Sequence, residues 1–337
     1  MTDESAASFD PVERHILVVS HTGRRDSIDA ALEVCSLLAA AGLRPVLPHG
    51  EFDDIRAAEP SFGGVDILGV DIAVGDLEAV IVLGGDGTIL RAAELARDTR
   101  APLIGVNLGH VGFLAESERD DLHETVERVL SREYEVEERF ALQIRVEVDG
   151  ERVYETWALN EATVEKASRE RMLEVVIEVD GRPLSSFGCD GVVMSTPTGS
   201  TAYNFSAGGP IVWPEVEAMI LVPLSAHALF ARPLVVGPGS TFAVEVLSRT
   251  DGSGVLWCDG RRAHKLEPGA RVVAQRSPRP VRLARLRKAP FTDRLVAKFH
   301  LPVTGWRGPH DALDGLDAVE GPDALDGSDA IDGPHAS

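Results

Sequence analysis

Two hydrophobic periods alternate in the first third of the chain. The apolar run from His15 to Ser20 has strand character, and from Ser27 to Ala41 apolar side chains recur every three or four residues, as on one face of a helix. Asp26 or Ser27 could cap the start of that helix, and Gly42 follows its end. Similar patterns predict strands at 44–47, 79–83 and 102–106 and a helix at 88–96. Strands that alternate with helices predict a parallel sheet covered on both faces, so we expect a doubly wound, Rossmann-like α/β domain.

The period changes after about residue 130. Residues 142–148 alternate strictly between apolar and polar side chains, and residues 173–179 do so again, which is typical of half-buried antiparallel strands. Asp-Gly pairs at 149–150, 180–181 and 259–260 are good hairpin turns because glycine tolerates positive φ. We therefore expect a β-rich, antiparallel second domain. The expected limits are 1–130 for the α/β domain and 131–287 for the β-rich domain, with a final helix at 291–299 in a segment, 288–305, that completes the first domain.

The end of the chain is a short internal repeat. Residues 308–337 contain four near-copies of six residues, DALDGL, DAVEGP, DALDGS and DAIDGP. Carboxylates at this spacing could bind calcium. Each copy has too few apolar side chains to offset the entropy of ordering, so we expect a disordered, solvated acidic tail.

Charge narrows the range of partners. The formal net charge is −21, and the tail contributes eight of the 54 acidic residues, so the rest of the chain is acidic too. Such a field repels nucleic acid, and we expect no nucleic-acid partner. No stretch approaches the roughly 20 apolar residues of a membrane span, and Met1 to Asp10 is acidic and polar, unlike a secretory signal. We expect a cytoplasmic protein with no membrane association.

The three cysteines also favour a cytoplasmic location. Cys35, Cys189 and Cys258 lie far apart and have no CxxC spacing, which fits a reducing compartment and argues against a disulfide or a zinc site. No basic residue adjoins Cys189, so we interpret it as a small buried side chain and not as a reactive thiol. We expect no metal ion held by the protein alone.

The strongest chemical signal is the run GGDGT at 84–88, between a buried strand and a helix. Glycines let backbone amides approach phosphate oxygens, and the N-terminus of the following helix adds partial positive charge. Asp86 lies at the carboxyl end of a parallel strand, where open α/β sheets bind ligands, so it is a candidate base or metal ligand. The alternative is a plain strand-to-helix turn. Two common nucleotide fingerprints do not fit, because Leu90 replaces the third glycine of GxGxxG and no Walker A lysine follows.

Two further signals follow in the second domain. Asp190-Gly191 precedes a segment dense in hydroxyls and glycines at 195–209, with a single aromatic, Tyr203, that fits phosphates and a ribose or base. The alternative for this segment is a set of Ser/Thr turns and a helix cap. The pair Asn160-Glu161 follows an apolar stretch, where an Asn is ordinarily a turn residue. His110, isolated in an apolar segment, is interpreted as structural.

Together these motifs resemble the NAD kinase family of bacterial and archaeal type, from about Asp76 to Val236. The matching runs are GGDGT at 84–88, NLGHVGFLAE at 107–116, LNEA at 159–162, DG at 190–191 and STPTGSTAYNFSAGGPI at 195–211. GGDGT alone is shared with lipid kinases and phosphofructokinases. The run TGSTAY after an NE pair is specific to NAD kinases.

The resemblance implies an activity and a set of site residues. The activity is Mg²⁺-dependent transfer of a phosphoryl group from ATP or polyphosphate to the 2′-hydroxyl of the adenosine ribose of NAD, which gives NADP. Asp86 is implied as the proton acceptor, Asn160 and Glu161 as contacts of the adenosine portion, and Tyr203 as a partner of a ring. The other implied binding residues are Gly84, Gly85, Gly87, Thr88, Arg91, Arg171, Asp190, Thr201, Ala202, Asn204, Phe205 and Ser206.

The family also implies a homodimer or homotetramer. We place the donor phosphates against the glycine turn and the NAD ribose across a cleft between the two domains. Arg91 and Arg171 would supply positive charge there, although each could be an ordinary solvated residue. Two alternatives remain: a lipid or sugar kinase that shares the GGDGT turn, and a noncatalytic NAD sensor.

Overall fold

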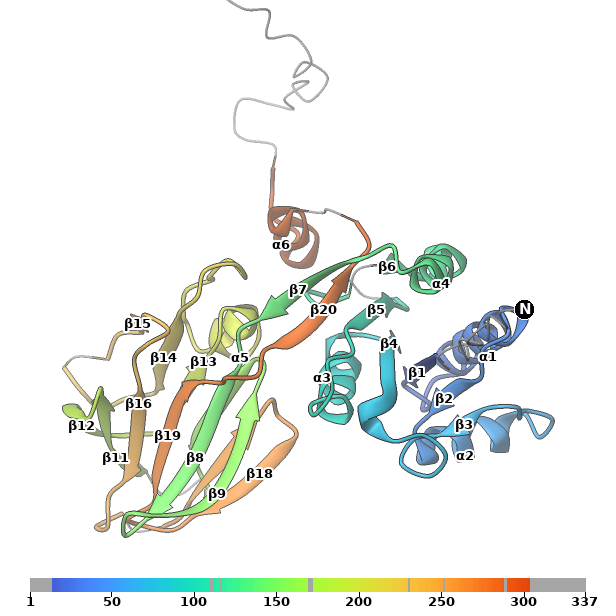
Figure 1. Ribbon diagram of the computed structural model, residues 1–337. Helices are drawn as coiled ribbons and strands as arrows, with labels where there is room; N and C mark the ends of the chain where they lie inside the picture. Colours follow the sequence, from blue (N-terminus) through green and yellow to red (C-terminus); the bar gives the residue numbers. More distant parts are fainter. Residues whose placement is uncertain are drawn as a thin grey trace, which may run out of the picture. The chain divides into compact units, whose positions relative to one another are not determined.

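The structure is a computed structural model that describes residues 14–109, 112–115, 117–168, 172–229, 231–250, 252–287 and 290–303 (Figure 1). The repeat at 308–337, His110 and Arg171 lie outside these residues. The chain divides into two units, Met1–Arg294 and Leu295–Ser337, and the boundary falls within helix α6 (Phe291–Phe299). All three sheets belong to the first unit. Within the described residues, no helix combines the length and apolar character needed to cross a membrane.

The first sheet has eight strands and is parallel except at one edge. Its order is β3-β2-β1-β4-β5-β20-β7, with β6 also paired to β5, and β20–β7 is the antiparallel pair. The strands are β1 (His15–Ser20), β2 (Pro45–Leu47), β3 (Asp66–Ile67), β4 (Leu77–Leu83), β5 (Leu103–Asn107), β6 (Ser117–Glu118), β7 (Glu135–Arg139) and β20 (Val281–Arg285). The predicted strands at 15–20, 44–47, 79–83 and 102–106 are confirmed as β1, β2, β4 and β5.

Helices cover both faces of this sheet, which confirms the doubly wound α/β fold (Figure 1). Apolar side chains of α1 (Arg25–Ala40), α2 (His49–Ala58) and α4 (Leu122–Ser131) share one buried cluster with one face of the strands. Those of α3 (Asp86–Leu95) share a second cluster with the other face. Two short 3-10 turns, Val74–Asp76 and Arg119–Asp121, precede β4 and α4.

The predicted cap of the first helix is wrong. Helix α1 begins at Arg25, and its N-cap residue Arg24 makes no side-chain cap hydrogen bond. Asp26 lies inside the first turn, where its charge favours the helix dipole, and Ser27 is buried. The predicted end is confirmed, because Gly42 follows the helix with a φ of +82°.

Two antiparallel six-stranded sheets form the second part of the first unit, as predicted. One has the order β15-β14-β13-β10-β17-β18 and the other β12-β11-β16-β19-β8-β9. Their strands are β8 (Leu142–Val148), β9 (Glu151–Ala158), β10 (Glu161–Lys166), β11 (Leu173–Val179), β12 (Arg182–Cys189), β13 (Gly191–Ser195), β14 (Met219–Leu224), β15 (Leu234–Val236), β16 (Phe242–Val246), β17 (Gly254–Cys258), β18 (Arg262–Leu266) and β19 (Arg271–Arg276).

The hairpin predictions are confirmed. Asp149-Gly150, Asp180-Gly181 and Asp259-Gly260 join β8 to β9, β11 to β12 and β17 to β18, and both residues of each pair have positive φ.

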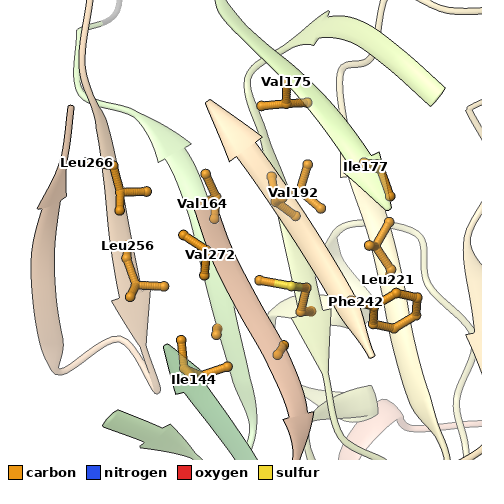
Figure 2. Close-up of a cluster of buried hydrophobic side chains, with 14 of the residues drawn as sticks. Ile144, Val164, Val175, Ile177, Val192, Leu221, Phe242, Leu256, Leu266 and Val272 are labelled. Atoms are coloured by element: carbon orange, nitrogen blue, oxygen red, sulfur yellow. The ribbon is translucent and has the colours of Figure 1, made fainter. Parts of the chain in front are cut away.

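A single hydrophobic core lies between the two antiparallel sheets. Ile144, Val175 and Phe242 come from one sheet and Val164 and Leu256 from the other, and all of them point into the same cluster (Figure 2). The alternating residues predicted for 142–148 and 173–179 supply one wall of this core. Cys189 and Cys258 are fully buried in it, and burial raises the pKa of both thiols to about 12. The interpretation of Cys189 as a small buried residue is confirmed.

The chain crosses twice between the first sheet and the sandwich. Residues 140–141 connect β7 to β8, and residues 277–280 connect β19 back to β20, so the first sheet takes two strands from the range assigned to the β-rich domain. The limits predicted at 130 and 287 therefore do not coincide with the edges of the sheets. Periodicity could not show this, because β7 is EVEER, a largely exposed edge strand with little apolar signal.

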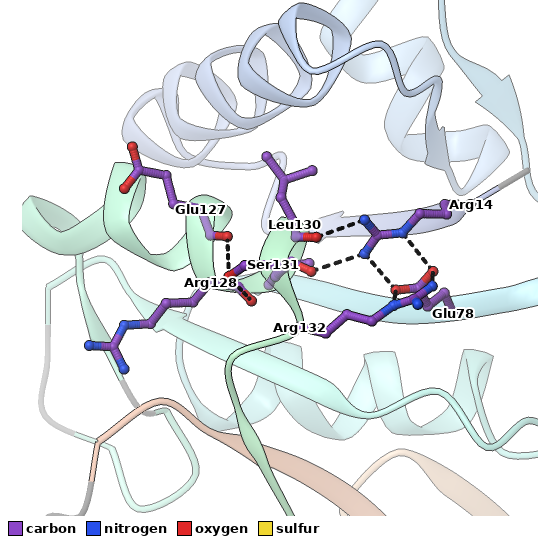
Figure 3. Close-up of polar contacts among 8 residues, drawn as sticks. Arg14, Glu78, Glu127, Arg128, Leu130, Ser131 and Arg132 are labelled. Atoms are coloured by element: carbon purple, nitrogen blue, oxygen red, sulfur yellow. Dashed lines mark hydrogen bonds and ion pairs between the residues drawn. The ribbon is translucent and has the colours of Figure 1, made fainter. Parts of the chain in front are cut away.

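An ion-pair network joins β4 to the segments before β1 and after α4. The Glu78 carboxylate accepts hydrogen bonds from Arg14 and Arg132, and Arg14 also donates to the carbonyl oxygens of Val129 and Leu130 (Figure 3). The two arginines, led by the hydrogen bonds from Arg132, lower the pKa of Glu78 to about 2. The network is structural and lies outside the predicted site.

Candidate active site

A cavity of about 630 Å³ opens where the order of the first sheet reverses. The chain moves from β1 outward to β2 and β3 and then returns to β4 and β5, so β1 and β4 flank the point at which an open α/β sheet binds ligands. The cavity is basic in an acidic protein, since three arginines, Arg24, Arg91 and Arg261, line it, against one carboxylate, Asp26, among the described residues; His21 also lines it. The other lining residues are Ser27, Gly84, Gly85, Gly87, Thr88, Asn107, Leu108 and Gly109.

Glycine occupies the three positions of the turn for different physical reasons. A Cβ at Gly84, whose φ is +151°, would lie 2.5 Å from Thr88 Oγ1, so the fold itself requires glycine there. A Cβ at Gly85 or Gly87 would meet nothing within 4 Å, and both residues are exposed. The folded chain therefore tolerates side chains at these two positions, and glycine there serves the close approach of a ligand to the backbone.

Asp86 is the first residue of α3 and has a fixed orientation. Its Oδ2 accepts a hydrogen bond from the amide of Phe113 and its Oδ1 one from the amide of Leu114, both at 3.1 Å. Gly112 makes room for it, because a Cβ there would lie 2.4 Å from Asp86 Oδ1. A carboxylate accepts about four hydrogen bonds, so these two leave capacity for a substrate hydroxyl.

Arg91 reaches the cavity from the second turn of α3 and is held by a buried carboxylate. Its Nη2 donates to Glu51 Oε1 at 2.5 Å, and its Nη1 donates to the carbonyl oxygen of Ser20 at 3.4 Å. Glu51 comes from the first turn of α2 and is only 1% exposed. Burial raises the pKa of Glu51, although hydrogen bonds from Ser20 and the charge of Arg91 oppose this.

Asn160 and Glu161 lie at the start of β10, and the β17–β18 turn holds them. The Asp259 carboxylate accepts hydrogen bonds from the amides of Leu159 at 3.0 Å and Asn160 at 2.7 Å, with a longer one from Glu161 at 3.4 Å. Arg262 pairs with the same carboxylate at 2.7 Å. The backbone of the Asn-Glu pair is thus fixed by an aspartate that the sequence marked only as a turn residue.

Glu161 is a buried acid with a strongly shifted pKa. Burial, helped by the charge of Asp259, raises the pKa of Glu161 to about 8, and a hydrogen bond from the backbone amide of Tyr203 acts in the opposite direction. Its Oε2 is buried and has no hydrogen-bond partner within the described structure. A buried polar atom left in this way is a candidate ligand contact.

The hydroxyl-rich loop divides into two halves. Ser195, Thr196 and Ser200 are fully buried, and their hydroxyls bond to backbone carbonyls of Asn160, Leu159 and Val212. These bonds span 12 to 37 residues, so the first half of the loop is structural but is not explained by local Ser/Thr turns. The second half reaches the surface, where Tyr203, Phe205 and Ser206 are exposed and Thr201 and Ala202 are half-buried.

Asn204 differs from its neighbours in the loop. It is fully buried, and its amide donates to the carbonyl oxygens of Ser200 at 3.2 Å and Pro210 at 3.1 Å. A Cβ at Gly209 would lie 2.4 Å from Asn204 Oδ1. In this structure Asn204 fixes the loop, and its predicted contact with substrate stays a prediction.

Asp190 lies in the turn between β12 and β13 and pairs with Lys166. Hydrogen bonds from Lys166 and Ser225 lower the pKa of Asp190, which therefore stays ionised. Burial, followed by the charges of Glu165, Glu161 and Asp190, raises the pKa of Tyr203, so its hydroxyl lies within electrostatic range of these carboxylates. The β10–β13 register pairs Glu161 with Ser195 and Glu165 with Gly191, so Glu161 and Asp190 lie toward opposite ends of β10. We call Glu161, Asp190 and Tyr203 the acidic neighbourhood.

A charged contact links this neighbourhood to the cavity. Glu94 of α3 pairs with Arg261 at 3.1 Å and with Arg262 at 3.3 Å. Arg262 pairs in turn with Asp259, and Arg261 lines the cavity. Sequence reasoning missed Asp259, Arg261 and Glu51. The signals were weak: two arginines directly after an Asp-Gly turn, and Glu51 four residues before Ile55 on one helix face.

The side chains near the glycine turn fit a magnesium ion that arrives with the phosphoryl donor. In the part of the chain that the structure describes, no group of three or more His, Cys, Asp and Glu side chains could hold a metal ion. Mg²⁺ in phosphoryl transfer is bound by one or two carboxylates and by the phosphates, and it keeps several waters. Asp86 in the glycine turn and Asp26 at the cavity wall fit such a donor-borne ion.

These features define a class. A basic cavity at the switch point of an α/β domain, backed by a glycine turn that carries a carboxylate, is the site of a nucleotide-dependent phosphotransferase.

Residues 67–134 match the ATP-NAD kinase N-terminal domain, and residues 159–286 match the ATP-NAD kinase C-terminal domain. The NAD kinase of Leifsonia xyli subsp. xyli is 69% identical over 305 residues, which cover 90% of this chain and 99% of that protein. The NAD kinase of Thermobifida fusca is 57% identical over 318 residues, covering 91% and 97%. The chain therefore belongs to the NAD kinase family, and the predicted resemblance is confirmed.

Solved structures agree with the fold. Yeast NADH kinase complexed with NADH has a TM-score of 0.78 at 21% identity, covering 87% of this chain and 90% of that chain. An NAD kinase from Archaeoglobus fulgidus in complex with ATP has a TM-score of 0.63 at 22% identity, covering 85% and 98%. At these identities the likeness concerns the fold alone, and it supports an α/β domain followed by a β-rich one.

Proposed function

We propose that the protein is an NAD kinase that transfers a phosphoryl group from ATP or polyphosphate, with Mg²⁺, to the 2′-hydroxyl of the adenosine ribose of NAD. The observation that carries this is the basic cavity at the ends of β1 and β4, backed by the turn that contains Asp86, in a chain of the NAD kinase family. NADP is the product. The family membership favours this reading over a lipid or sugar kinase that shares only GGDGT.

The donor phosphates would lie in the basic cavity. The open backbone at Gly85 and Gly87, the N-terminus of α3 and the guanidinium groups of Arg24, Arg91 and Arg261 offset their charge. Mg²⁺, bound to these phosphates when present, supplies further charge neutralisation, and Asp86 or Asp26 would contact it. Phosphoryl transfer through a loose transition state depends mainly on such positioning.

The acceptor would lie between Asp86 and the neighbourhood of Glu161, Asp190 and Tyr203. The two backbone amides at 3.1 Å aim the Asp86 carboxylate, which takes the proton of the attacking ribose hydroxyl. Glu161, protonated below its pKa of about 8, can donate a hydrogen bond from its unpartnered Oε2 to the adenosine portion. Tyr203 offers an exposed ring, and Thr201, Ala202, Asn204, Phe205 and Ser206 would complete the wall.

Three further expectations stay predictions. Contact of Arg91 and Arg171 with the ligands, a homodimer or homotetramer, and a cytoplasmic location derive from the resemblance or from composition. The absence of a nucleic-acid partner is also a prediction, and it rests on the net charge of −21.

The activity is tested with purified protein, NAD and Mg²⁺, with ATP and polyphosphate in parallel. We expect NADP from the wild type and a loss of roughly 10² to 10⁴ in rate for Asp86→Asn, because the amide cannot accept the proton in the same way. The unfolding temperature of the variant should change little, since an amide oxygen can still accept one of the two backbone hydrogen bonds. Undiminished turnover by the variant would remove Asp86 from the proposed role.

The same assay separates the noncatalytic alternative. A sensor would bind NAD, as measured by calorimetry, and form no NADP with either donor. That outcome would replace the kinase proposal with a binding function at the same site.

A further inference from the structure

Glu51 is a buried carboxylate close to the cavity, and the proposed chemistry does not use it. It lies in the first turn of α2, between β1 and the glycine turn in sequence, and is 1% exposed. Glu51 is not among the described residues that line the cavity, and its contacts are with Ser20 and Arg91. Its burial therefore needs another reason, because an isolated buried carboxylate is costly.

Its two oxygens tie together two walls of the cavity. Oε2 accepts hydrogen bonds from the Ser20 amide at 2.6 Å and from the Ser20 hydroxyl at 3.1 Å. Oε1 accepts one from Arg91 Nη2 at 2.5 Å. Ser20 is the last residue of β1 and directly precedes His21, which lines the cavity, while Arg91 lines it from α3.

Arg91 closes the same network from its other nitrogen. Its Nη1 donates to the carbonyl oxygen of Ser20 at 3.4 Å, so the guanidinium bridges Glu51 and the end of β1. The Arg91 side chain remains 33% exposed, on the side of the cavity. A guanidinium held by two acceptors loses little further entropy when it meets a phosphate.

We infer that Glu51 is a positioning residue for the phosphoryl donor, one that holds Arg91 and the β1 terminus in the arrangement that receives polyphosphate oxygens. This inference rests on the proposed donor site. It assigns Glu51 no contact with substrate and no role toward NAD.

A positioning role of Glu51 and a purely electrostatic effect of its charge predict opposite changes in phosphate binding when Glu51 is neutralised. Glu51 is negative and lies close to a cavity for anions, so by Coulomb's law its neutralisation should tighten phosphate binding. A positioning role predicts the reverse, because Glu51→Gln turns an amide NH₂ toward the Ser20 N–H or the guanidinium and releases one of them. Loss of a charge-assisted hydrogen bond corresponds to a weakening of roughly 10- to 100-fold.

The experiment measures ATP binding by calorimetry and NADP formation as a function of ATP and of NAD. For Glu51→Gln we expect weaker ATP binding and a KM for ATP raised by roughly 10- to 100-fold, with the KM for NAD and the rate at saturating ATP within about threefold of wild type. Asp53→Asn is the matched control: the same chemical change on the same helix, at a side chain that is 60% exposed and paired with His49. It should leave all three quantities unchanged.

A second variant keeps the test decisive if Glu51→Gln does not fold. Arg91→Lys retains the cation but not the fork that reaches Glu51 and Ser20 together, and we expect the same donor-specific loss. Unchanged or tighter ATP binding in Glu51→Gln, or equal rises in both KM values, would overturn the inference. Failure of the wild type to form NADP while it binds ATP in a Glu51-dependent manner would overturn the proposed acceptor chemistry and leave the inference standing.

Discussion

At the scale of single residues, the proposed acceptor side of the site contains two buried carboxylates, Glu161 and Asp259. Asp259 accepts hydrogen bonds from backbone amides and pairs with Arg262, whereas Glu161 Oε2 has no hydrogen-bond partner among the described residues. Burial raises the pKa of both groups. The folded chain therefore holds a proton on Glu161 that the unfolded chain would release.

This proton makes stability depend on pH with a defined sign. The pKa of Glu161 is about 8 in the folded state against an ordinary value of 4.5, so the folded state binds more protons between these values and its stability falls as pH rises through the window. We predict that the free energy of unfolding of the wild type falls by roughly 2 to 4 kcal/mol more than that of Glu161→Gln from about pH 5 to about pH 8. Urea titrations of both proteins across this range measure it. Parallel pH profiles would show that Glu161 is ionised throughout.

At the scale of elements, the glycines in the turn between β4 and α3 differ in whether packing requires them. Gly84 meets Thr88 within the turn, whereas the space beside Gly87 is open and faces the cavity. One sequence motif therefore contains a glycine required by packing and glycines that packing does not require, for which we propose contact with a ligand.

A matched pair of substitutions tests this division. We predict that Gly84→Ala lowers the free energy of unfolding by roughly 2 to 4 kcal/mol, because its Cβ would clash with Thr88 at a positive φ. Gly87→Ala should be neutral or stabilising by up to about 1 kcal/mol, since alanine is the better helix former. It should still raise the KM for ATP by about 10-fold or more, because a methyl group occupies the phosphate approach. Thermal unfolding and steady-state kinetics give both quantities, and equal effects of the two changes would contradict the division.

At the scale of the whole molecule, the first sheet includes β20, a strand from near the end of the first unit. Val281 and Leu283 of β20 pack in the same cluster as α3, and Leu159, next to the Asn-Glu pair, joins them. Arg97 and Arg262 also lie over the ring of Trp157, at 4.1 and 4.5 Å from its centroid. The α/β part therefore depends on residues far along the chain.

We predict that a fragment of residues 1–130 does not fold cooperatively, because β5 lacks its neighbour β20 and the α3 cluster lacks Val281, Leu283 and Leu159. Residues 1–303 should unfold in one transition. Circular dichroism and amide NMR dispersion distinguish the two fragments. A sharp thermal transition in the short fragment would show that the domain closes without β20.

The sequence by itself determined the local features. Period and turn chemistry act over a few residues, so they located β1, β2, β4 and β5, the alternating strands β8 and β11, and the three Asp-Gly hairpins. They missed α2, where only Glu51 and Ile55 are buried, and β7, which is nearly all polar. The motifs located the glycine turn and Asp86 because phosphate binding needs glycines before a helix N-terminus, and the resemblance to the NAD kinase family singled out the Asn-Glu pair.

Only the tertiary structure decided which distant groups meet. Three contacts join residues at least 40 positions apart: β20 pairs with β5, Asp259 accepts hydrogen bonds from the backbone of the Asn-Glu pair, and Glu51 accepts one from Arg91. No local pattern encodes such contacts. They form because a buried charge must find a partner and a sheet edge must be covered, and the folded chain as a whole determines which group is within reach.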